Sequence, residues 1–257
     1  MNLLAIDIGN THTVLGIFKR KKLVDEWRME SSARLTEARL WTHVSLFCAE
    51  AGVSSRNFDG IVIASVVPRL TELLTVMSKK RFGKNPLLIS GNSDVGLNIC
   101  YDDPTALGAD RICSVVAAYR KYGAPAIVID CGTATTYDII SKRGEYLGGV
   151  IAAGVETSAM SLFRRTARLP SIALQFPDHL IGTNTIACLQ SGIMYGALDA
   201  VDGMIRRLRR EIGGNAHVIA TGGYAQLVGP RSRFIDHIDL DLVLEGARLI
   251  FERVNRR

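Results

Sequence analysis

Two aspartates, Asp7 and Asp130, each end an apolar stretch long enough for a buried strand. Each is followed two residues later by a glycine, and then by residues with amide or hydroxyl side chains. A carboxylate in such a place is costly unless a cation or hydrogen-bond donors meet it. The turn offers backbone N–H groups and hydroxyls to phosphate oxygens, and the carboxylate can hold a cation directly or through water. One copy would favour a plain hairpin without a ligand, whereas two copies favour paired phosphate loops.

The two turns belong to a longer internal repeat. Residues 4–13 align with residues 127–136 at a constant offset, so that apolar strand, Asp, Gly and terminal Thr coincide. A duplicated half-domain is the natural interpretation, with chance similarity of two strand–turn–strand units as the alternative. No GxxxxGK[ST] sequence is present and no GxGxxG opens a helix after the first strand, which argues against P-loop and Rossmann folds.

A third glycine turn, Thr221-Gly222-Gly223, follows the apolar stretch His217–Ala220. Two glycines before a helix suit the close approach of a nucleotide, although such a pair also serves as a plain strand-to-helix connection. In this order the three turns resemble the two phosphate elements and the adenosine element of the actin, sugar-kinase and heat-shock-chaperone ATPase superfamily.

The segment Tyr101-Asp102-Asp103-Pro104-Thr105-Ala106-Leu107-Gly108-Ala109-Asp110-Arg111 narrows this resemblance. Together with Asp7-Ile8-Gly9-Asn10-Thr11 and Asp130-Cys131-Gly132-Thr133-Ala134-Thr135-Thr136, it resembles the type III pantothenate kinases over essentially the whole chain. The resemblance implies ATP-dependent phosphorylation of the primary hydroxyl of pantothenate to 4'-phosphopantothenate, the first step of coenzyme A synthesis. It also implies a homodimer.

The same resemblance assigns roles to single residues. Asp110 would be the base that accepts the hydroxyl proton; otherwise it is an ion-pair partner of Arg111 or a helix-start charge. Thr185 would reach the site of the neighbouring subunit; otherwise it is a plain helix N-terminal residue. The other expected pantothenate contacts are Tyr101, Gly108, Ala109, Asp110 and Arg111. The expected ATP contacts are Asp7, Ile8, Gly9, Asn10, Thr11, His12, Thr13, Val14, Thr133, Gly222 and Gly223.

Cations are part of this expectation, because a site without a P-loop lysine must offset the nucleotide's charge otherwise. By resemblance, Asp7 orients Mg²⁺ through water, and Asp130 marks a site for a monovalent cation, K⁺ or NH4⁺. The chain departs from the family at Ala153, where proline is usual, and at Thr183, which is often arginine. Losing the proline removes a backbone restraint on the adjoining loop.

Strands and helices must alternate to position these residues. Apolar stretches predict strands at 3–7, 13–18, 60–66, 87–89, 126–130, 135–141, 146–151 and 217–220. Helical spacing predicts helices at 34–51, from Pro68 to Gly83, and at 107–122, 157–167 and 184–212, with a last helix capped by Asp239. This order indicates an α/β fold of two related, ribonuclease-H-like halves of mixed sheet plus helices, 1–116 and 117–257, with a nucleotide cleft between them. The second half would carry the dimer interface.

Composition excludes several classes of protein. The 257 residues are 47% hydrophobic and 22% charged, which is typical of a globular chain rather than a disordered one. The apolar stretches are far shorter than a membrane span, and Asp7 interrupts any signal-peptide core. Five cysteines without CxxC spacing argue against zinc and disulfides, so we expect a cytoplasmic enzyme.

The net charge of +6 leaves other functions open. Short basic runs such as Arg206–Arg210 could bind nucleic acid, but no aromatic residues interleave with them, and they also suit steering of anionic small molecules. The basic charge leaves open a kinase-fold accessory protein that acts on transcription. A separate alternative keeps the fold and mechanism but phosphorylates another small alcohol.

Overall fold

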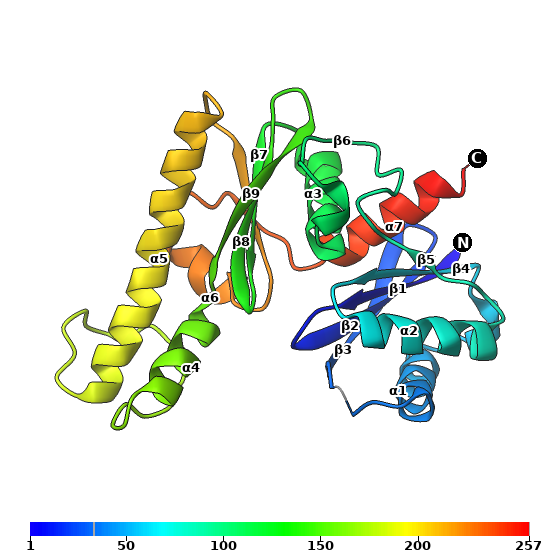
Figure 1. Ribbon diagram of the computed structural model, residues 1–257, viewed down its shortest axis with the longest axis horizontal. Helices are drawn as coiled ribbons and strands as arrows, with labels where there is room; N and C mark the ends of the chain where they lie inside the picture. The colour runs from blue at the N-terminus through cyan, green and yellow to red at the C-terminus, as the bar shows by residue number, and fades with distance from the viewer. Residues whose placement is uncertain (33, 257) are drawn as a thin grey trace. The chain divides into compact units, whose positions relative to one another are not determined.

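The computed structural model describes residues 1–32 and 34–256, and the chain divides into two compact units. The first contains 1–117 and 241–257, and the second contains 118–240. Figure 1 labels the elements of both. The C-terminal helix thus groups with the first unit, which differs from the halves 1–116 and 117–257 expected from the sequence.

The first unit is built on a five-stranded sheet with the order β3-β2-β1-β4-β5. Its strands are β1 (Asn2–Ile8), β2 (His12–Lys19), β3 (Lys22–Glu30), β4 (Gly60–Ser65) and β5 (Leu87–Leu88). β2 is antiparallel to β1 and β3, whereas β4 is parallel to β1 and β5. The unit also contains β6 (Asn98–Ile99), α1 (Glu37–Glu50), α2 (Pro68–Met77), α7 (Leu242–Val254), the first part of α3 (Ala109–Tyr122), and the short helices η1 (Ser55–Asn57), η2 (Ser78–Phe82) and η3 (Pro104–Ala106).

The second unit repeats this topology. Its strands are β7 (Ala126–Cys131), β8 (Ala134–Ile140), β9 (Glu145–Ala153), β10 (His217–Thr221) and β11 (His237–Ile238), and they lie in the order β9-β8-β7-β10-β11. β8 is antiparallel to β7 and β9, and β10 is parallel to β7 and β11. Each unit therefore lays out its five strands in the same order and directions, as a duplicated half-domain predicts. Its helices are α4 (Val155–Arg165), α5 (Thr185–Glu211), α6 (Ala225–Val228) and η4 (Gly229–Arg231).

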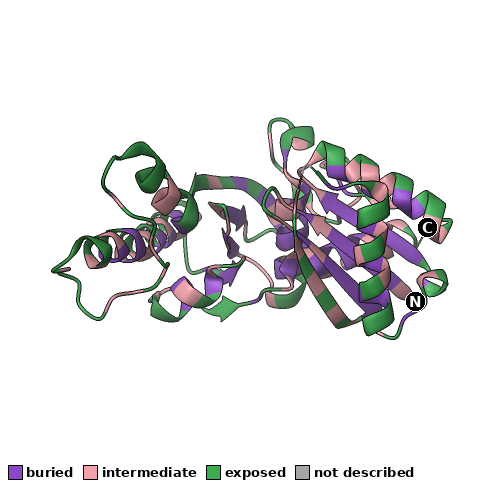
Figure 2. Cartoon of the chain, turned by 90° about the horizontal axis from the view of Figure 1, so that it is seen from below, coloured by how far each residue is buried: buried purple, intermediate pink, exposed green. Residues whose placement is uncertain are grey.

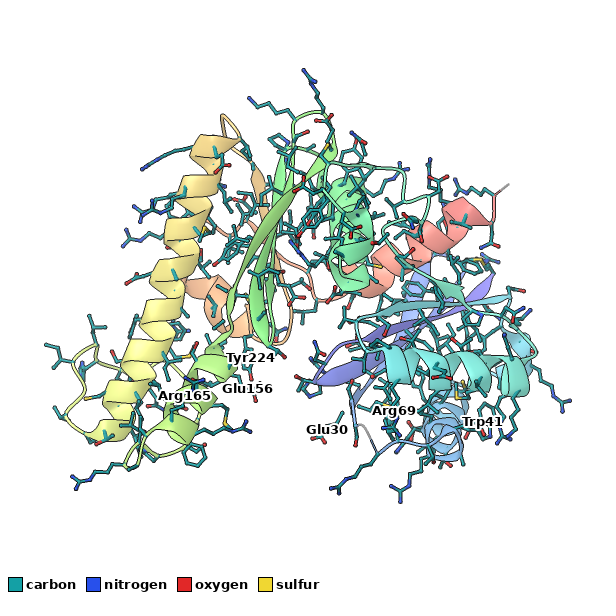
Figure 3. The ribbon with its side chains drawn as sticks, in the orientation of Figure 1. Glu30, Trp41, Arg69, Glu156, Arg165 and Tyr224 are labelled. Carbon is teal, nitrogen blue, oxygen red and sulfur yellow. The ribbon has the colours of Figure 1, made fainter. Side chains whose placement is uncertain are left out.

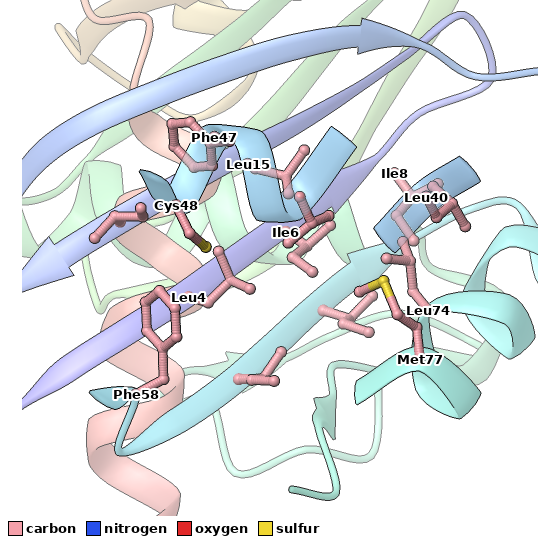
Figure 4. Packing of buried hydrophobic residues seen from close by; sticks show 14 of the residues in the cluster. Leu4, Ile6, Ile8, Leu15, Leu40, Phe47, Cys48, Phe58, Leu74 and Met77 are labelled. Carbon is pink, nitrogen blue, oxygen red and sulfur yellow. The ribbon is translucent and has the colours of Figure 1, made fainter. Parts of the chain in front are cut away.

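Each sheet buries an apolar core against its helices (Figure 2). In the first unit, alternate residues of β1 such as Leu4 and Ile6 pack with Leu40 of α1 and Leu74 of α2 (Figure 4). In the second unit, strand residues such as Ile129 pack with the inner face of α5. Burial of this kind stabilises by roughly 25 cal/mol per Å² of apolar surface, so both sheets are rigid supports for the turns at their ends.

The helix α7 covers the other face of the first sheet, and glycines make room for it. A Cβ on Gly16 of β2 would stand 2.8 Å from a methyl group of Leu244. On Gly60 of β4 it would overlap the ring of Phe251. This contact with the sheet is the physical reason why the last residues of the chain group with the first unit.

Two expectations about local structure are wrong. No strand was predicted at β3, although Leu23, Trp27 and Met29 alternate with exposed residues there. Asp239 does not cap the last helix, which begins at Leu242 after Asp241. Asp239 is instead buried, and its Oδ2 accepts hydrogen bonds from Lys121 Nζ at 2.6 Å and Tyr122 Oη at 2.8 Å.

The Lys121–Asp239 pair predicts a pH-dependent contribution to stability. The hydrogen bond to Asp239 raises the pKa of Lys121 above its ordinary value of 10.5. A raised folded-state pKa stabilises fully below the ordinary value, and the gain is lost as pH rises through the raised one. Because Lys121 is more than half exposed, we expect Lys121→Met to cost at most about 1 kcal/mol at neutral pH. Urea unfolding at pH 7 and above pH 10.5 checks this; an equal difference at both pH values would contradict it.

Candidate functional site

The first predicted phosphate loop is the tight turn between β1 and β2. The Gly9 N–H donates to the His12 carbonyl at 2.9 Å, and Asp7 lies opposite Val14 in the paired strands. A Cβ at Gly9 would lie only 3.1 Å from that carbonyl oxygen. Asn10 and Thr11 are exposed at the tip, while Asp7 is half-buried at the end of its strand. The turn predicted at 9–11 is confirmed, and it leaves polar groups facing outward.

Thr13 is held by a residue that the sequence analysis missed. Its side chain is 2% exposed, and its hydroxyl lies 2.8 Å from the Ser31 hydroxyl. The Ser31 N–H also donates to the Thr11 carbonyl at 2.8 Å. Ser31 follows β3 directly, so recognising the alternation in that strand would have pointed to it. The pair fixes the outgoing side of the first loop.

The predicted base, Asp110, lies in the first turn of α3. Its Oδ1 accepts from the Arg111 N–H at 2.8 Å, and a Cβ on Gly108 would stand 2.5 Å from that same oxygen. Only glycine fits at 108 without moving the carboxylate. Glycine at 108 thus leaves room for the Asp110 carboxylate, which the Arg111 N–H holds at the start of the helix.

One buried thiol links Asp110 to Asp7. Burial raises the pKa of Cys113 well above its usual value, and the charges of Asp7 and Asp110 raise it further. Both carboxylates are therefore close enough to act on the same sulfur atom, although Asp7 ends β1 and Asp110 begins α3. The structure thus brings the predicted phosphate-loop carboxylate and the predicted base into one neighbourhood.

The helix α7 packs against α3 and fixes its position. A Cβ on Gly246 would overlap the backbone carbonyl of Cys113, so the two helices touch backbone to backbone. This contact lies one turn beyond Asp110. A helix from the end of the chain thus supports the one that carries the predicted base.

The segment before α3 is ordered by its own hydrogen bonds. Asp103 accepts from the Thr105 N–H at 2.9 Å and from the Thr105 hydroxyl, and these bonds lower the pKa of Asp103. A Cβ on Gly91 would overlap the Pro104 carbonyl, so this turn also rests on neighbouring backbone. Tyr101 and Arg111, on either side, are both half-buried.

The second predicted phosphate loop joins β7 to β8 and is one residue shorter than the first. The Gly132 N–H donates to the Ala134 carbonyl at 3.0 Å. Asp130 lies opposite Thr136, and Cys131 opposite Thr135. The structural counterpart of Thr13 is therefore Thr135 rather than Thr136, and the constant offset of the repeat ends at the glycine.

Asp130 lies against the Thr-Gly-Gly turn. Thr221 is its partner in the neighbouring parallel strand, and a Cβ on Gly222 would overlap Asp130 Oδ1. Gly222 has φ +87°, a conformation that favours glycine. The Tyr224 N–H donates to the Cys131 carbonyl at 2.9 Å, which ties the two turns together. The structure thus joins two of the three glycine turns that the sequence singled out.

Thr133, at the tip of the second loop, is connected to the start of α4. Its carbonyl accepts from the Gly154 N–H at 3.1 Å and from the Thr157 hydroxyl at 2.6 Å. Ala153 pairs with Ala134 as the last residue of β9. Figure 3 shows Tyr224 and Glu156 at this same end of the second sheet. The second loop, the start of α4 and the Thr-Gly-Gly turn thus lie at the same end of the sheet. Ala153 occupies an ordinary strand position, although the family usually has proline there.

Thr185 lies apart from this cluster, as the first residue of the long helix α5. Asn184 caps the helix, because its side chain accepts from the Ala187 N–H at 2.9 Å. Thr183 and Thr185 are both exposed. The prediction of a helix N-terminal position is confirmed, and the hydroxyl is available to a partner.

The donor chemistry of both turns fits the cations expected there. Asp7 offers a carboxylate oxygen of the kind that Mg²⁺ prefers. A Cβ on Gly132 or Gly222 would lie within 3.3 Å of Asp130 Oδ1, so glycine at both positions keeps added side-chain carbon away from that oxygen. In residues 1–32 and 34–256, no cluster of three or more His, Cys, Asp or Glu side chains could form a cation cage by itself. Among those same residues, no helix is long and apolar enough to cross a membrane.

Comparisons with known proteins show the family of this chain. A family model described as type III pantothenate kinase matches residues 3–207. The type III pantothenate kinase of Moorella thermoacetica is 47% identical over 251 residues, covering 98% of this chain and 99% of that protein. The one from Halalkalibacterium halodurans is 45% identical with the same coverage.

Solved structures show the fold alone. MreB 5 of Spiroplasma citri bound to AMPPNP has a TM-score of 0.58 at 10% identity, covering 99% of this chain and 97% of that one. Component A of the (R)-2-hydroxyglutaryl-CoA dehydratase of Acidaminococcus fermentans has a TM-score of 0.57 at 15% identity, covering 97% and 95%. Two mixed sheets with helices are thus confirmed as the fold class, and these two solved structures share that fold.

Proposed function

The chain belongs to the type III pantothenate kinase family, and from this premise we propose that it transfers a phosphoryl group from ATP to the primary hydroxyl of pantothenate. The product, 4'-phosphopantothenate, enters coenzyme A synthesis. The observation that carries the proposal is the family membership, and within the structure the Asp110 carboxylate is held at the start of α3 by the Arg111 N–H, in the same unit as the first loop. It supports a phosphate loop and a base serving the same reaction.

The proposed mechanism gives each segment one task. Asp110 accepts the proton of the pantothenate hydroxyl as that oxygen attacks the γ-phosphorus, and the bond from this phosphorus to the β–γ bridging oxygen breaks so that ADP leaves. The first loop, Asp7 to Val14, and Thr133 of the second loop contact the ATP phosphates, while Gly222 and Gly223 let the adenosine part approach the backbone. Tyr101 and Gly108–Arg111 hold pantothenate, and Arg111 offers a guanidinium to its carboxylate.

Cations complete the charge balance of the proposed site. Mg²⁺ bound with ATP would be oriented by Asp7 through water, and K⁺ or NH4⁺ would be held by Asp130. When bound, they neutralise charge that develops on the phosphoryl oxygens. The net charge of +6 supports electrostatic steering of two anionic substrates. Because the five cysteines show no CxxC spacing, we infer separately that the enzyme works in the cytoplasm.

A coupled assay tests the proposal. ADP release in the presence of Mg²⁺, K⁺ and ATP should depend on added pantothenate, with 4'-phosphopantothenate identified by mass. ADP release that responds instead to another small alcohol in a substrate panel would transfer the proposal to that acceptor. The accessory role in transcription is not favoured by the relatives; DNA binding with a steep salt dependence and no kinase activity would support it.

A groove in the second unit supports the proposed homodimer. It has a volume of about 370 Å³ and lies between α4 and α5. Gly192 and Gly196 of α5 line it, and a Cβ on either would meet no atom within 4 Å. Packing within the chain therefore does not require these glycines. Leu162, which lines the groove, is an exposed apolar side chain, and Ile186 beside Thr185 is a second exposed one on α5. A second copy is the proposed occupant, because the family resemblance places Thr185 in the neighbouring subunit's site.

Filling this groove should disrupt the dimer. Gly196→Leu places a large side chain where a second copy would pack, so we expect monomers and a raised KM for pantothenate. Sedimentation velocity and assays at matched concentrations measure both. Glu72→Leu, which adds an apolar side chain to the exposed face of α2, is the matched control and should leave the assembly state unchanged. A dimeric Gly196→Leu protein with wild-type KM would contradict the assignment of this surface.

A further inference from the structure

A buried carboxylate that the proposed reaction does not use lies two residues beyond the second phosphate loop. Asp138 of β8 is 1% exposed. Its Oδ1 accepts a hydrogen bond from the Tyr146 hydroxyl at 2.8 Å, and its Oδ2 accepts one from the Thr136 hydroxyl at 3.4 Å. Tyr146 is itself 1% exposed. A buried carboxylate is costly unless it is hydrogen-bonded, so these contacts are part of what allows it in the sheet.

Strand geometry places this group beside Asp130. Residues of a strand alternate between the two faces of a sheet, so Thr136 and Asp138 share one face, while Tyr137 and Ile139 point into the apolar core on the other. Thr136 is the direct partner of Asp130 across the antiparallel pair, so their side chains also share a face. Tyr146, Asp138, Thr136 and Asp130 therefore form a series of neighbours that leads from the buried sheet to the loop.

The hydrogen-bond direction sets what Thr136 can do. A threonine hydroxyl has one proton and two acceptor lone pairs. Because the carboxylate of Asp138 takes the proton, the oxygen of Thr136 has only lone pairs left to offer. Such an oxygen suits a cation and cannot donate to a phosphate oxygen. Beside Asp130, it adds a neutral ligand to a charged one.

We propose that Tyr146 and Asp138 are positioning residues that hold the Thr136 hydroxyl as an oxygen ligand for the monovalent cation at Asp130. The proposal rests on the proposed function, because the cation is expected from that family. It assigns the strength of the potassium response to two hydrogen bonds, one within β8 and one between β8 and β9. Neither Tyr146 nor Asp138 touches substrate in this proposal.

Removing single hydroxyls tests the proposal. Tyr146→Phe leaves the buried ring in place but removes the hydrogen bond to Asp138 Oδ1, which helps to orient the carboxylate that the Thr136 hydroxyl meets. Thr136→Val removes the ligand, and Thr136→Ser restores a hydroxyl. We expect the K⁺ concentration for half-maximal effect to rise at least ten-fold in Thr136→Val and several-fold in Tyr146→Phe, with Thr136→Ser near wild type. Tyr137→Phe, which removes a buried tyrosine hydroxyl from the other face of β8, should leave the K⁺ concentration for half-maximal effect unchanged.

Two readouts separate this proposal from the proposed function. The first is the thermal midpoint of the ATP-free protein titrated with KCl against tetramethylammonium chloride, which needs no catalysis. The second is the K⁺ dependence of KM and kcat with pantothenate. If the wild-type protein responds to K⁺ in the first readout but does not phosphorylate pantothenate, the proposed function is wrong, whereas Thr136 as a ligand of the cation is still supported. No K⁺ response in wild type, or an unchanged response in Thr136→Val, would overturn the inference.

Discussion

Replacing Asp110 with asparagine is expected to lower kcat by roughly 10²–10⁴-fold, the usual contribution of a general base. Asparagine keeps the shape of the side chain, and its amide oxygen still accepts from the Arg111 N–H. The start of α3 and the contact with Gly108 are thereby preserved. What is lost is the ability to take the hydroxyl proton. Steady-state assays over a range of pantothenate concentrations measure the change in kcat and KM separately.

The control for this variant is Asp102→Asn, which removes an exposed negative charge from the same segment. It should keep nearly all of the activity. ATP binding measured by calorimetry should also be unchanged in Asp110→Asn, because the base contacts the acceptor rather than the nucleotide. An Asp110→Asn enzyme with wild-type kcat would remove Asp110 from the role of base and leave it as a charge at a helix start.

Gly222→Ala is expected to have the second large effect, on both stability and nucleotide binding. The added methyl group would overlap Asp130 Oδ1 and would also stand 2.9 Å from the backbone of Cys131. Overpacking of this kind costs about 1–3 kcal/mol, and a non-glycine residue in the left-handed region adds about 1–2 kcal/mol. We therefore expect a lower free energy of unfolding, measured by urea unfolding. We also expect ATP affinity to weaken by at least ten-fold, measured by calorimetry.

Gly213→Ala separates the two causes. Gly213 also has a positive φ, +72°, but a Cβ there would meet nothing within 4 Å. This variant should show only the backbone cost and bind ATP normally. If Gly222→Ala lowers the stability and the ATP affinity no more than Gly213→Ala does, the close contact between the Thr-Gly-Gly turn and Asp130 does not contribute to nucleotide binding.

Much of the fold was predictable because its signals are local. The strand ends at Asp7 and Asp130, the turn at Gly9 and the cap of α5 at Asn184 follow from residue type and spacing. The missed strand β3 shows the limit. Its outward residues are charged and its inward ones only half-buried, so its alternation is weaker than that of a central strand.

Other features depend on contacts that a sequence does not display. Asp239 has the residue type of a helix cap, yet its carboxylate accepts hydrogen bonds from Lys121 and Tyr122, more than one hundred residues earlier. The second loop is a residue shorter than the first, and only the strand register reveals it. The link from Asp7 to Asp110 through Cys113 likewise requires β1 and α3 to be placed in space.

The grouping of residues 241–257 with the first unit has a consequence for how the protein is made. The first unit is interrupted by the second, so its sheet is synthesised long before α7, which covers Gly16 and Gly60. On the ribosome, that face of the sheet stays uncovered until α7 has left the exit tunnel. The nascent chain thus has all residues of its inserted unit before its first unit can be completed, and a chain arrested before residue 241 would leave an apolar face of the first sheet exposed to chaperones.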